Sequence, residues 1–195
     1  SRADIRVWEV DGMTGEQHNY SDWGGHVVCH TDGQIEFDDD VVRILEIKSM
    51  NLASFDKFVA KGVKRSHPHY YAQVQMMMGM SGMTETLFIA ICKNNSKYHA
   101  ELVEADPFEY AYIADRISRI MNGAKTRVTA DPLDWRCSGC FKRSVCWDEV
   151  SVEPSCPTCA NAIPRRDGTW RCQVTGLEAV HACVSYERFV VDDKT

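Results

Sequence analysis

The pattern of apolar and polar side chains predicts a sheet in the N-terminal part of the chain. Residues 5–10 alternate as a half-buried strand does, and residues 23–30 are typical of a strand that runs toward Asp32. Further along, residues 85–92 form a continuous apolar run of the kind found in a central strand. Residues 98–103 are predicted to add the next strand of the same sheet.

Three segments carry apolar residues at helical spacing. Residues 52–65 form the first, residues 67–82 form a second that enters through Pro68 and ends at Gly82, and the third runs from Asp106 to Gly123. The methionines of the second helix are interpreted as core packing: Met76, Met77, Met78 and Met80. This order of elements predicts an α/β (α+β) fold, with a mixed central sheet flanked by helices.

A pair of charged residues interrupts the apolar pattern of residues 44–49. Leu45 and Ile47 are predicted to enter the core, so Glu46 and Lys48 share the opposite face of the strand. Asp32 precedes Gly33, which predicts a turn with an acidic residue beside it. Two carboxylates and one ammonium are therefore expected to meet in one pocket.

This trio suits metal-assisted hydrolysis of a phosphodiester. A hard cation such as Mg²⁺ prefers oxygen ligands, which Asp32, Glu46 and the backbone carbonyl of Ile47 can supply. Lys48 would then stabilise the attacking hydroxide or the developing negative charge. The alternative from these residues alone is an exposed cross-strand ion pair, worth about 0.2–1 kcal/mol.

The helix downstream makes the pattern specific. Asp32-Gly33, Glu46-Ile47-Lys48 and the Gln-bearing segment Tyr71-Ala72-Gln73-Val74-Gln75 follow one another in the order found in the PD-(D/E)XK nuclease superfamily. The chain resembles its RecB-like, phage lambda exonuclease (YqaJ-type) and CRISPR-associated iron-sulfur branches over about residues 20 to 92.

The resemblance implies a restriction-endonuclease-like core in residues 1–132, with Mg²⁺ or Mn²⁺ as cofactor. It implies metal binding by Asp32 and Glu46, catalysis by Lys48, and positioning of the lysine or a phosphate by Gln73. Two departures are visible: Met77 stands where the RecB branch prefers tyrosine, and no helix is evident ahead of Asp32. The core is therefore expected to lack its N-terminal helix in this sequence.

Charge and composition limit the classes of protein to which this sequence can belong. Hydrophobic residues make up 44% and charged residues 26%, which is globular composition, and the net charge of -6 argues against a protein that wraps DNA through overall positive charge. No run of 18 apolar residues and no charged-then-apolar leader occurs, so we expect a soluble, cytoplasmic protein of a bacterium or phage-infected cell without a membrane partner.

Local clusters of basic residues could still follow a phosphate backbone. One cluster precedes the Gln-bearing helix and is either a phosphate-tracking patch or a solvated helix face: Lys57, Lys61, Lys64, Arg65, His67 and His69. The residues predicted to contact DNA are Gln75, Lys64, Arg65, Arg165 and Arg166. His30, next to the expected pocket, is a further candidate for substrate contact, whereas His26 and Cys29 are interpreted as structural.

The composition changes after Pro132, since seven of the nine cysteines fall between residues 137 and 183. A small segment with so little apolar material needs disulfides or a metal to fold, so residues 133–195 are predicted to be a cysteine-rich metal-binding region. Cys137, Cys140 and Cys146 resemble the C-terminal cysteine triplet of the iron-sulfur nucleases, which implies a [4Fe-4S] cluster or zinc. The fourth ligand is not evident in the sequence.

A second group has the spacing of a four-cysteine zinc ribbon: Cys156, Cys159, Cys172 and Cys183. Buried free thiols or disulfides are the alternative. His181 could replace one ligand of this group or complete the first one. Arg165, Arg166 and Trp170 lie between the ligands and suit stacking and phosphate contact.

Together these features predict a Mg²⁺- or Mn²⁺-dependent DNA nuclease, with exonuclease action favoured by analogy. It would act in phage or bacterial recombination, repair or replication, with DNA and a recombination or replication protein as partners. The rival is a non-catalytic nucleic-acid-binding or assembly module on a nuclease scaffold. A third hypothesis is a zinc-dependent hydrolase that uses the cysteines and histidines directly.

Overall fold

The computed structural model describes residues 5–123, 127–147, 150–181 and 183–189. The chain divides into two compact units, residues 1–115 and residues 116–195, and each is described by itself. The change of composition at Pro132 lies inside the second unit. The predicted domains, residues 1–132 and 133–195, stay a prediction.

The first unit is built on a mixed five-stranded sheet with the order β1-β4-β5-β6-β7. Its strands are β1 (Arg6–Trp8), β4 (Gly33–Glu36), β5 (Val42–Met50), β6 (Glu85–Cys92) and β7 (Tyr98–Glu104). Only the β5–β6 pair is parallel, so the chain must cross over between these two strands, and it does so through two helices. The mixed sheet with covering helices confirms the predicted α/β class.

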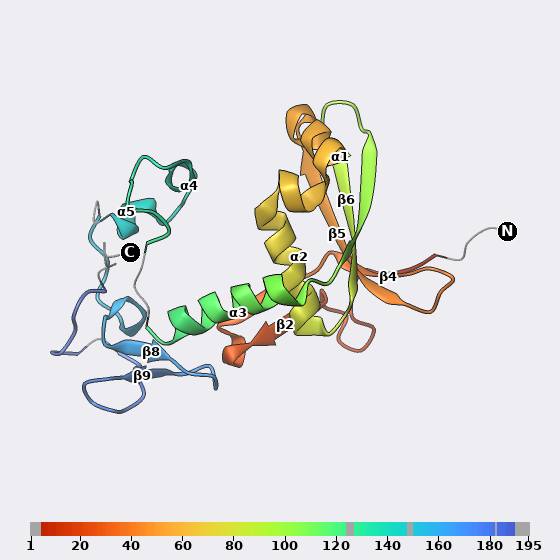
Figure 1. The fold of residues 1–195 in the computed structure, drawn as a ribbon. Helices are drawn as coiled ribbons and strands as arrows, with labels where there is room; N and C mark the ends of the chain where they lie inside the picture. Colours follow the sequence, from red (N-terminus) through yellow and green to blue (C-terminus); the bar gives the residue numbers. More distant parts are fainter. Residues whose placement is uncertain (1–4, 124–126, 148–149, 182, 190–195) are drawn as a thin grey trace. The chain divides into compact units, whose positions relative to one another are not determined.

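The crossover helices are α1 (Leu52–Ser66) and α2 (Pro68–Ser81), and Figure 1 shows both on the same side of β5 and β6. Asn51 caps α1 by accepting from the Ser54 N–H, and Gly82 ends α2 in the left-handed conformation, as predicted. A hydrophobic core joins the helices to the sheet: Ile44, Met50, Phe55, Phe58, Val63, Tyr71, Val74, Met77, Met78, Phe88, Ala90, Cys92 and Val103. The predicted core role of Met77 and Met78 is therefore confirmed.

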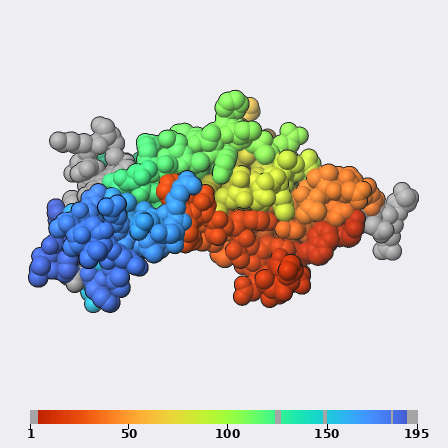
Figure 2. All heavy atoms as spheres, turned by 90° about the horizontal axis from the view of Figure 1, so that it is seen from below, coloured from red at the N-terminus to blue at the C-terminus, as the bar shows by residue number. Residues whose placement is uncertain are grey.

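A short antiparallel hairpin, β2 (Asn19–Asp22) and β3 (Val27–His30), lies outside the main sheet. It packs against α2, and Figure 2 shows N-terminal residues, in red, beside the yellow residues of that helix. Residues 23–30 were predicted as one strand, which is wrong for Trp23–Gly25, because these residues form a 3-10 turn. Among the described residues ahead of Asp32 no α-helix occurs.

Two predicted burial patterns are wrong. All three residues of β1 are exposed, although a half-buried strand was expected there. The second pattern is wrong for Ile47 but not for Leu45, which is buried as predicted. Ile47 was expected in the core but is 39% exposed, because β5 turns the side of Ile44 and Met50 toward the helices. Ile44 and Met50 belong to the core, and since side chains alternate along a strand, Glu46 and Lys48 lie on this same helix-covered face.

The division between the units falls within α3 (Pro107–Met121), and the residues described after this helix form only short elements. These are α4 (Trp135–Ser138), α5 (Arg143–Cys146), a 3-10 turn η2 (Cys156–Thr158) and the hairpin β8 (Ala162–Pro164) with β9 (Trp170–Cys172). Of the described residues between 127 and 189, Cys137 and Cys156 alone are buried. Apolar burial therefore contributes little to holding this segment together.

Candidate active site

Asp32 is joined to β5 by a hydrogen bond that no pattern in the sequence specifies. Strand pairing sets Gly33 opposite Leu45, and the Ile47 N–H donates to Asp32 Oδ2 at 2.7 Å. Because Ile47 lies between Glu46 and Lys48, this contact holds the Asp32 carboxylate beside the Glu-x-Lys segment. Asp32 therefore lies beside the Glu-x-Lys segment, where it was expected.

Gly33 is required for a different reason than the one expected. The Asp32-Gly33 pair was predicted as a turn, but Gly33 begins β4 and is buried between its neighbours. A Cβ atom at this position would lie 2.9 Å from the Trp8 carbonyl oxygen, which is too close for any side chain. Glycine therefore permits the close pairing of β1 with β4 immediately beside Asp32.

Glu46 and Lys48 form a buried ion pair on the helix-covered face of β5. Glu46 is 2% exposed and its Oε1 contacts Lys48 Nζ. Burial raises the pKa of the Glu46 carboxyl, and the charge of Asp32 adds to this rise, while the hydrogen bond from Lys48 opposes it. A buried carboxylate paired with one ammonium thus lies beside the exposed carboxylate of Asp32.

The first turn of α2 lies beside this pair. Lys48 Nζ lies 5.2 Å from the centroid of the Tyr70 ring, and the His69 ring lies 4.1 Å from that of Tyr70. Burial, together with the charge of Lys48, lowers the pKa of His69. The sequence interpretation gave no role to Tyr70. Its spacing of three residues before Gln73, which sets both on one helix face, is the signal that could have found it.

Gln73 is half-buried on α2 and follows His69 by four residues and Tyr70 by three. Residues at these spacings are neighbours on a helix, so Gln73 lies on the face that contacts Lys48. This position fits the role predicted for Gln73, which stays a prediction.

Gln75 does not fit the DNA contact expected of it. The residue is 1% exposed, its Nε2 donates to the Glu104 carbonyl at 2.9 Å, and its Oε1 accepts from the Asp106 N–H at 2.7 Å. Both ends of the amide are therefore committed to backbone atoms, and Gln75 fastens α2 to the end of β7.

The residues of the basic cluster before α2 differ in exposure and in partners. Lys57, Lys61 and Arg65 are exposed, in keeping with either predicted role. Lys64 forms an ion pair with Asp106 at 3.0 Å. His67 is 7% exposed and is not part of a surface patch.

Hydroxyl groups surround the His67 ring. Ser66 Oγ donates to the Gly62 carbonyl at 2.5 Å, so it accepts from His67 Nδ1 at 2.8 Å. The remaining ring nitrogen, Nε2, lies 2.6 Å from Ser54 Oγ and can accept its hydroxyl proton. These partners suit a neutral imidazole, and burial lowers the pKa of His67 accordingly.

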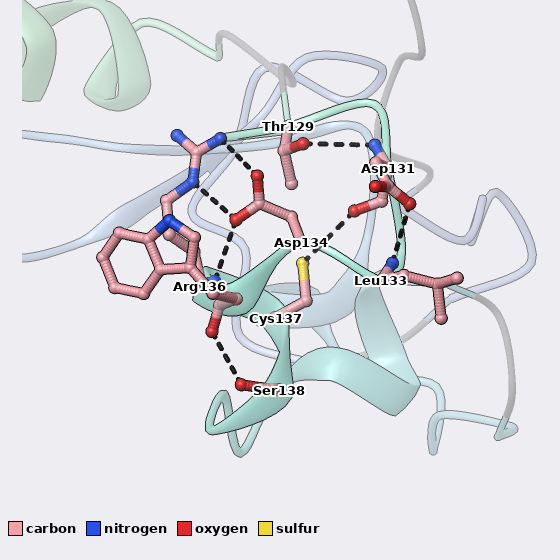
Figure 3. A network of polar contacts seen from close by, with 8 residues as sticks. Thr129, Asp131, Leu133, Asp134, Arg136, Cys137 and Ser138 are labelled. Carbon is pink, nitrogen blue, oxygen red and sulfur yellow. Dashed lines mark hydrogen bonds and ion pairs between the residues drawn. The ribbon is translucent and has the colours of Figure 1, made fainter.

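Of the first cysteine group, Cys137 lies in a local network of polar contacts, shown in Figure 3. Asp134 caps α4 and pairs with Arg136, and the Cys137 thiol lies 3.9 Å from the Asp131 carbonyl oxygen. Cys140 is exposed and Cys146 is half-buried. Nothing in these contacts supports the metal predicted for the three cysteines, which stays a prediction.

The second cysteine group lines one cavity: Cys156, Cys159, Cys172 and Cys183, together with His181. Burial raises the pKa of the Cys156 thiol, and the charges of Cys159, Cys183 and Cys172 add to the rise. Among the described residues, no three His, Cys, Asp or Glu side chains are already arranged as a ligand set for a metal ion.

The remaining predicted contacts lie on the surface. Arg165 and Arg166 follow β8, and Arg165 lies 3.7 Å from Asp167 with both side chains about half exposed. His30 is exposed at the end of β3. Their DNA or substrate contacts stay predictions.

The contacts of Asp32 with β5 all lie inside one segment that matches a known family. Residues 11–84 match the YqaJ-like viral recombinase domain. This family is a member of the PD-(D/E)XK nuclease superfamily, so the lambda-exonuclease-type resemblance is confirmed. The YqaJ-like segment contains Asp32, Glu46, Lys48 and Gln73, and it supports a phage-type nuclease or recombination function.

Comparison with other proteins adds little to the YqaJ-like match. None of the curated proteins matches the chain. A solved structure titled "Crystal structure of SSO0001" is similar at 15% identity and a TM-score of 0.43, covering 76% of this chain. The chain spans 60% of the length of that structure. In the part of the chain that the structure describes, no helix has the length and apolar character needed to cross a bilayer.

Proposed function

We propose that the chain is a divalent-metal-dependent deoxyribonuclease, of exonuclease type, acting in phage or bacterial recombination, repair or replication. One observation carries the proposal: the 2.7 Å hydrogen bond from Ile47 N–H to Asp32 Oδ2, which joins the acidic residue to the Glu46-Lys48 pair. The YqaJ-like match over residues 11–84 supports the choice of nuclease. DNA in the cytoplasm of the infected or bacterial cell is the proposed substrate, with a recombination or replication protein as a further partner.

The donor set fits Mg²⁺ or Mn²⁺. Asp32, which is bonded to the backbone of the residue after Glu46, and Glu46 itself can offer carboxylate oxygens. The Ile47 carbonyl can add a neutral oxygen, and these are the ligand types that hard cations prefer. When bound, such a cation supplies Lewis acidity toward a phosphoryl oxygen and acidifies coordinated water. Glu46 is almost fully buried and pairs with Lys48, the one ion-pair partner it has among the described residues, so additional positive charge near it would be favourable.

The other residues would act on the nucleophile and the phosphate. Lys48, 23% exposed at its side chain, can donate hydrogen bonds to an attacking water or to a phosphate oxygen. The Tyr70 ring limits the directions in which Lys48 can move. Gln73, one turn along α2, can orient the lysine or hold a phosphate oxygen through its amide.

The test compares Lys48→Ala and Asp32→Asn with the unmutated chain on linear duplex DNA, in Mg²⁺ and in Mn²⁺. We expect at least a hundredfold loss of hydrolysis in both variants, since each removes a group that would act on the reacting phosphate. Lys97→Ala is the matched control, because this exposed lysine lies in the β6–β7 turn. Equal hydrolysis by Lys48→Ala and the unmutated chain would refute the role assigned to Lys48. No hydrolysis by the unmutated chain would favour the non-catalytic binding module.

A further inference from the structure

Three separate turns of the second unit bring four cysteines to the wall of one cavity, and none of the four forms a disulfide. We infer that Cys156, Cys159, Cys172 and Cys183 bind one zinc ion through their four sulfurs, as a structural site remote in sequence from Asp32 and Glu46. The inference does not rest on the proposed nuclease function.

Strand pairing brings Cys172 next to the first two cysteines. In the β8–β9 hairpin, Ala162 stands opposite Cys172, and the Ala162 N–H donates to the Cys159 carbonyl at 3.2 Å. The hairpin therefore brings Cys172 next to Ala162, which is itself bonded to the last residue of the turn from Cys156 to Cys159. Backbone hydrogen bonds thus bring together two cysteines, Cys159 and Cys172, that are 13 residues apart in the sequence.

A second set of backbone contacts brings in the segment that carries Cys183. Cys159 forms an antiparallel bridge with Arg188. The Ala160 N–H donates to the Glu187 carbonyl at 2.7 Å, and the Phe189 N–H donates to the Thr158 carbonyl at 2.9 Å. The residues after Cys183 are thus paired with the turn between Cys156 and Cys159, so all three cysteine-bearing segments meet.

Each segment also turns tightly at its cysteine. The Cys159 N–H donates to the Cys156 carbonyl at 3.0 Å, the Gly176 N–H to the Cys172 carbonyl at 2.9 Å, and the Tyr186 N–H to the Cys183 carbonyl at 2.9 Å. Gly176 has a φ of 71°, which favours glycine at that turn. Tight turns at cysteines present the thiol and nearby backbone N–H groups on one side, the arrangement that suits a metal bound by thiolates.

The described residues around the four cysteines form no apolar core that could replace a metal. Cys156 is the one buried side chain among the described residues from 150 to 189. Large apolar side chains of the same segment are exposed, with Leu177 at 71%, Val180 at 61% and Val184 at 106% of full exposure. A loop-rich segment of this kind needs a cross-link, and zinc coordination couples directly to folding.

The four side chains line the cavity without already forming a tetrahedral set. Cysteine has a single side-chain torsion with three staggered positions, so each sulfur can turn inward while its backbone stays in place. Binding Zn²⁺ by four thiols releases four protons and leaves a tetrathiolate site with two negative charges. His181 lines the same cavity, and its exchange for one sulfur is the alternative that the test separates.

The experiment measures zinc per chain in the purified full-length protein by elemental analysis and replaces zinc by Co²⁺ for absorption spectroscopy. Cys172→Ser is expected to hold one zinc fewer than the unmutated chain, and to lose the thiolate-to-cobalt and tetrahedral cobalt bands. Cys29→Ser is the matched control, because Cys29 is a half-buried thiol of the first unit. His181→Ala is expected to keep both the zinc and the spectrum.

Equal zinc in Cys172→Ser and the unmutated chain would overturn the inference, as would loss of zinc in His181→Ala. If Cys172→Ser fails to fold, thiol modification of the unmutated chain decides the matter. Stepwise blocking of four thiols should release one zinc, whereas a chain that contains no zinc, or that has these cysteines paired as disulfides before reduction, refutes the site.

Discussion

At the scale of single residues, the most consequential arrangement is the ion pair of Glu46 with Lys48. A carboxylate that is 2% exposed is stable as an anion only when a cation compensates for its lost hydration. Lys48 supplies that cation and is also the residue proposed to act on the phosphate. A change at Lys48 is therefore expected to alter both stability and hydrolysis, and the two effects must be measured separately.

Lys48→Ala is expected to lower the free energy of unfolding by about 1–3 kcal/mol, because Glu46 would lose its charged hydrogen-bond partner. Urea unfolding measures this change. The double variant Glu46→Gln, Lys48→Met should recover much of the lost stability, since a neutral amide needs no cation, yet remain inactive in hydrolysis. Stability of Lys48→Ala equal to that of the unmutated chain would contradict a compensated buried pair.

His67 is expected to make stability depend on pH. Its folded pKa lies below the ordinary 6.5, so between the two values the unfolded chain binds more protons than the folded one. The free energy of unfolding should consequently fall as the pH decreases from above 6.5 toward the folded pKa. Comparing urea unfolding across this range with the variant His67→Gln should reveal a shallower slope in the variant. An unchanged slope would show that other groups cause the dependence.

At the scale of elements, the structure separates two glutamines that sequence reasoning could not. Both lie on α2, two residues apart, and either could have carried the superfamily's glutamine. Gln75 is used to bind the backbone where β7 leads into α3, a partner about 30 residues away that no local pattern reveals. Gln73 lies one turn from Tyr70, on the face beside Lys48.

Substitution by leucine should therefore reduce stability at Gln75 and DNA hydrolysis at Gln73. Gln75→Leu is expected to reduce the free energy of unfolding by about 1–3 kcal/mol, because the Asp106 N–H and the Glu104 carbonyl lose their partner. Gln73→Leu should leave the unfolding curve nearly unchanged while decreasing DNA hydrolysis at least tenfold. Thermal unfolding and initial rates of both variants make the comparison, and a reversed pattern would exchange the two assignments.

Helices and strands were predicted correctly where residues close in the sequence form them, and less well where they depend on residues far apart in the sequence. The apolar run of β6 and the caps of α1 and α2 are set by near neighbours, and residues 85–92 were predicted with the observed bounds. The predicted burial of β5 held for Leu45 but was wrong for Ile47, because Ile44 and Met50 are the side chains that meet the helices. Likewise, the hydrogen bond between Asp32 and Ile47 depends on strand register, which the sequence does not display.

At the scale of the whole molecule, the net charge of -6 must be reconciled with a polyanionic substrate. The exposed lysines of α1, Lys57 and Lys61, give one local positive surface in the first unit. Lys64, in contrast, is compensated by Asp106. DNA affinity should depend on the first two lysines more than on the third.

The double variant Lys57→Ala, Lys61→Ala is expected to weaken binding to DNA of any sequence and to reduce the slope of log affinity against log salt by about 2, one for each lost phosphate contact. Lys64→Ala is the control and should change that slope by less than about 1. Fluorescence anisotropy between low and moderate salt, with Ca²⁺ in place of Mg²⁺ to limit cleavage, gives both slopes. Equal slopes for the double variant and Lys64→Ala would indicate that Lys57 and Lys61 lie on a solvated helix face that does not contact DNA.

The register of the β4–β5 hairpin has a consequence for how this sequence can change during evolution. Asp32 reaches the Ile47 N–H because Gly33 stands opposite Leu45, and a slip by one residue would reverse the face of every side chain in one strand. Insertions at the exposed tip around Asp38 leave this pairing intact. A single-residue insertion or deletion between Gly33 and Glu36, or between Val42 and Glu46, would separate the acidic residues while conserving each of them in the sequence.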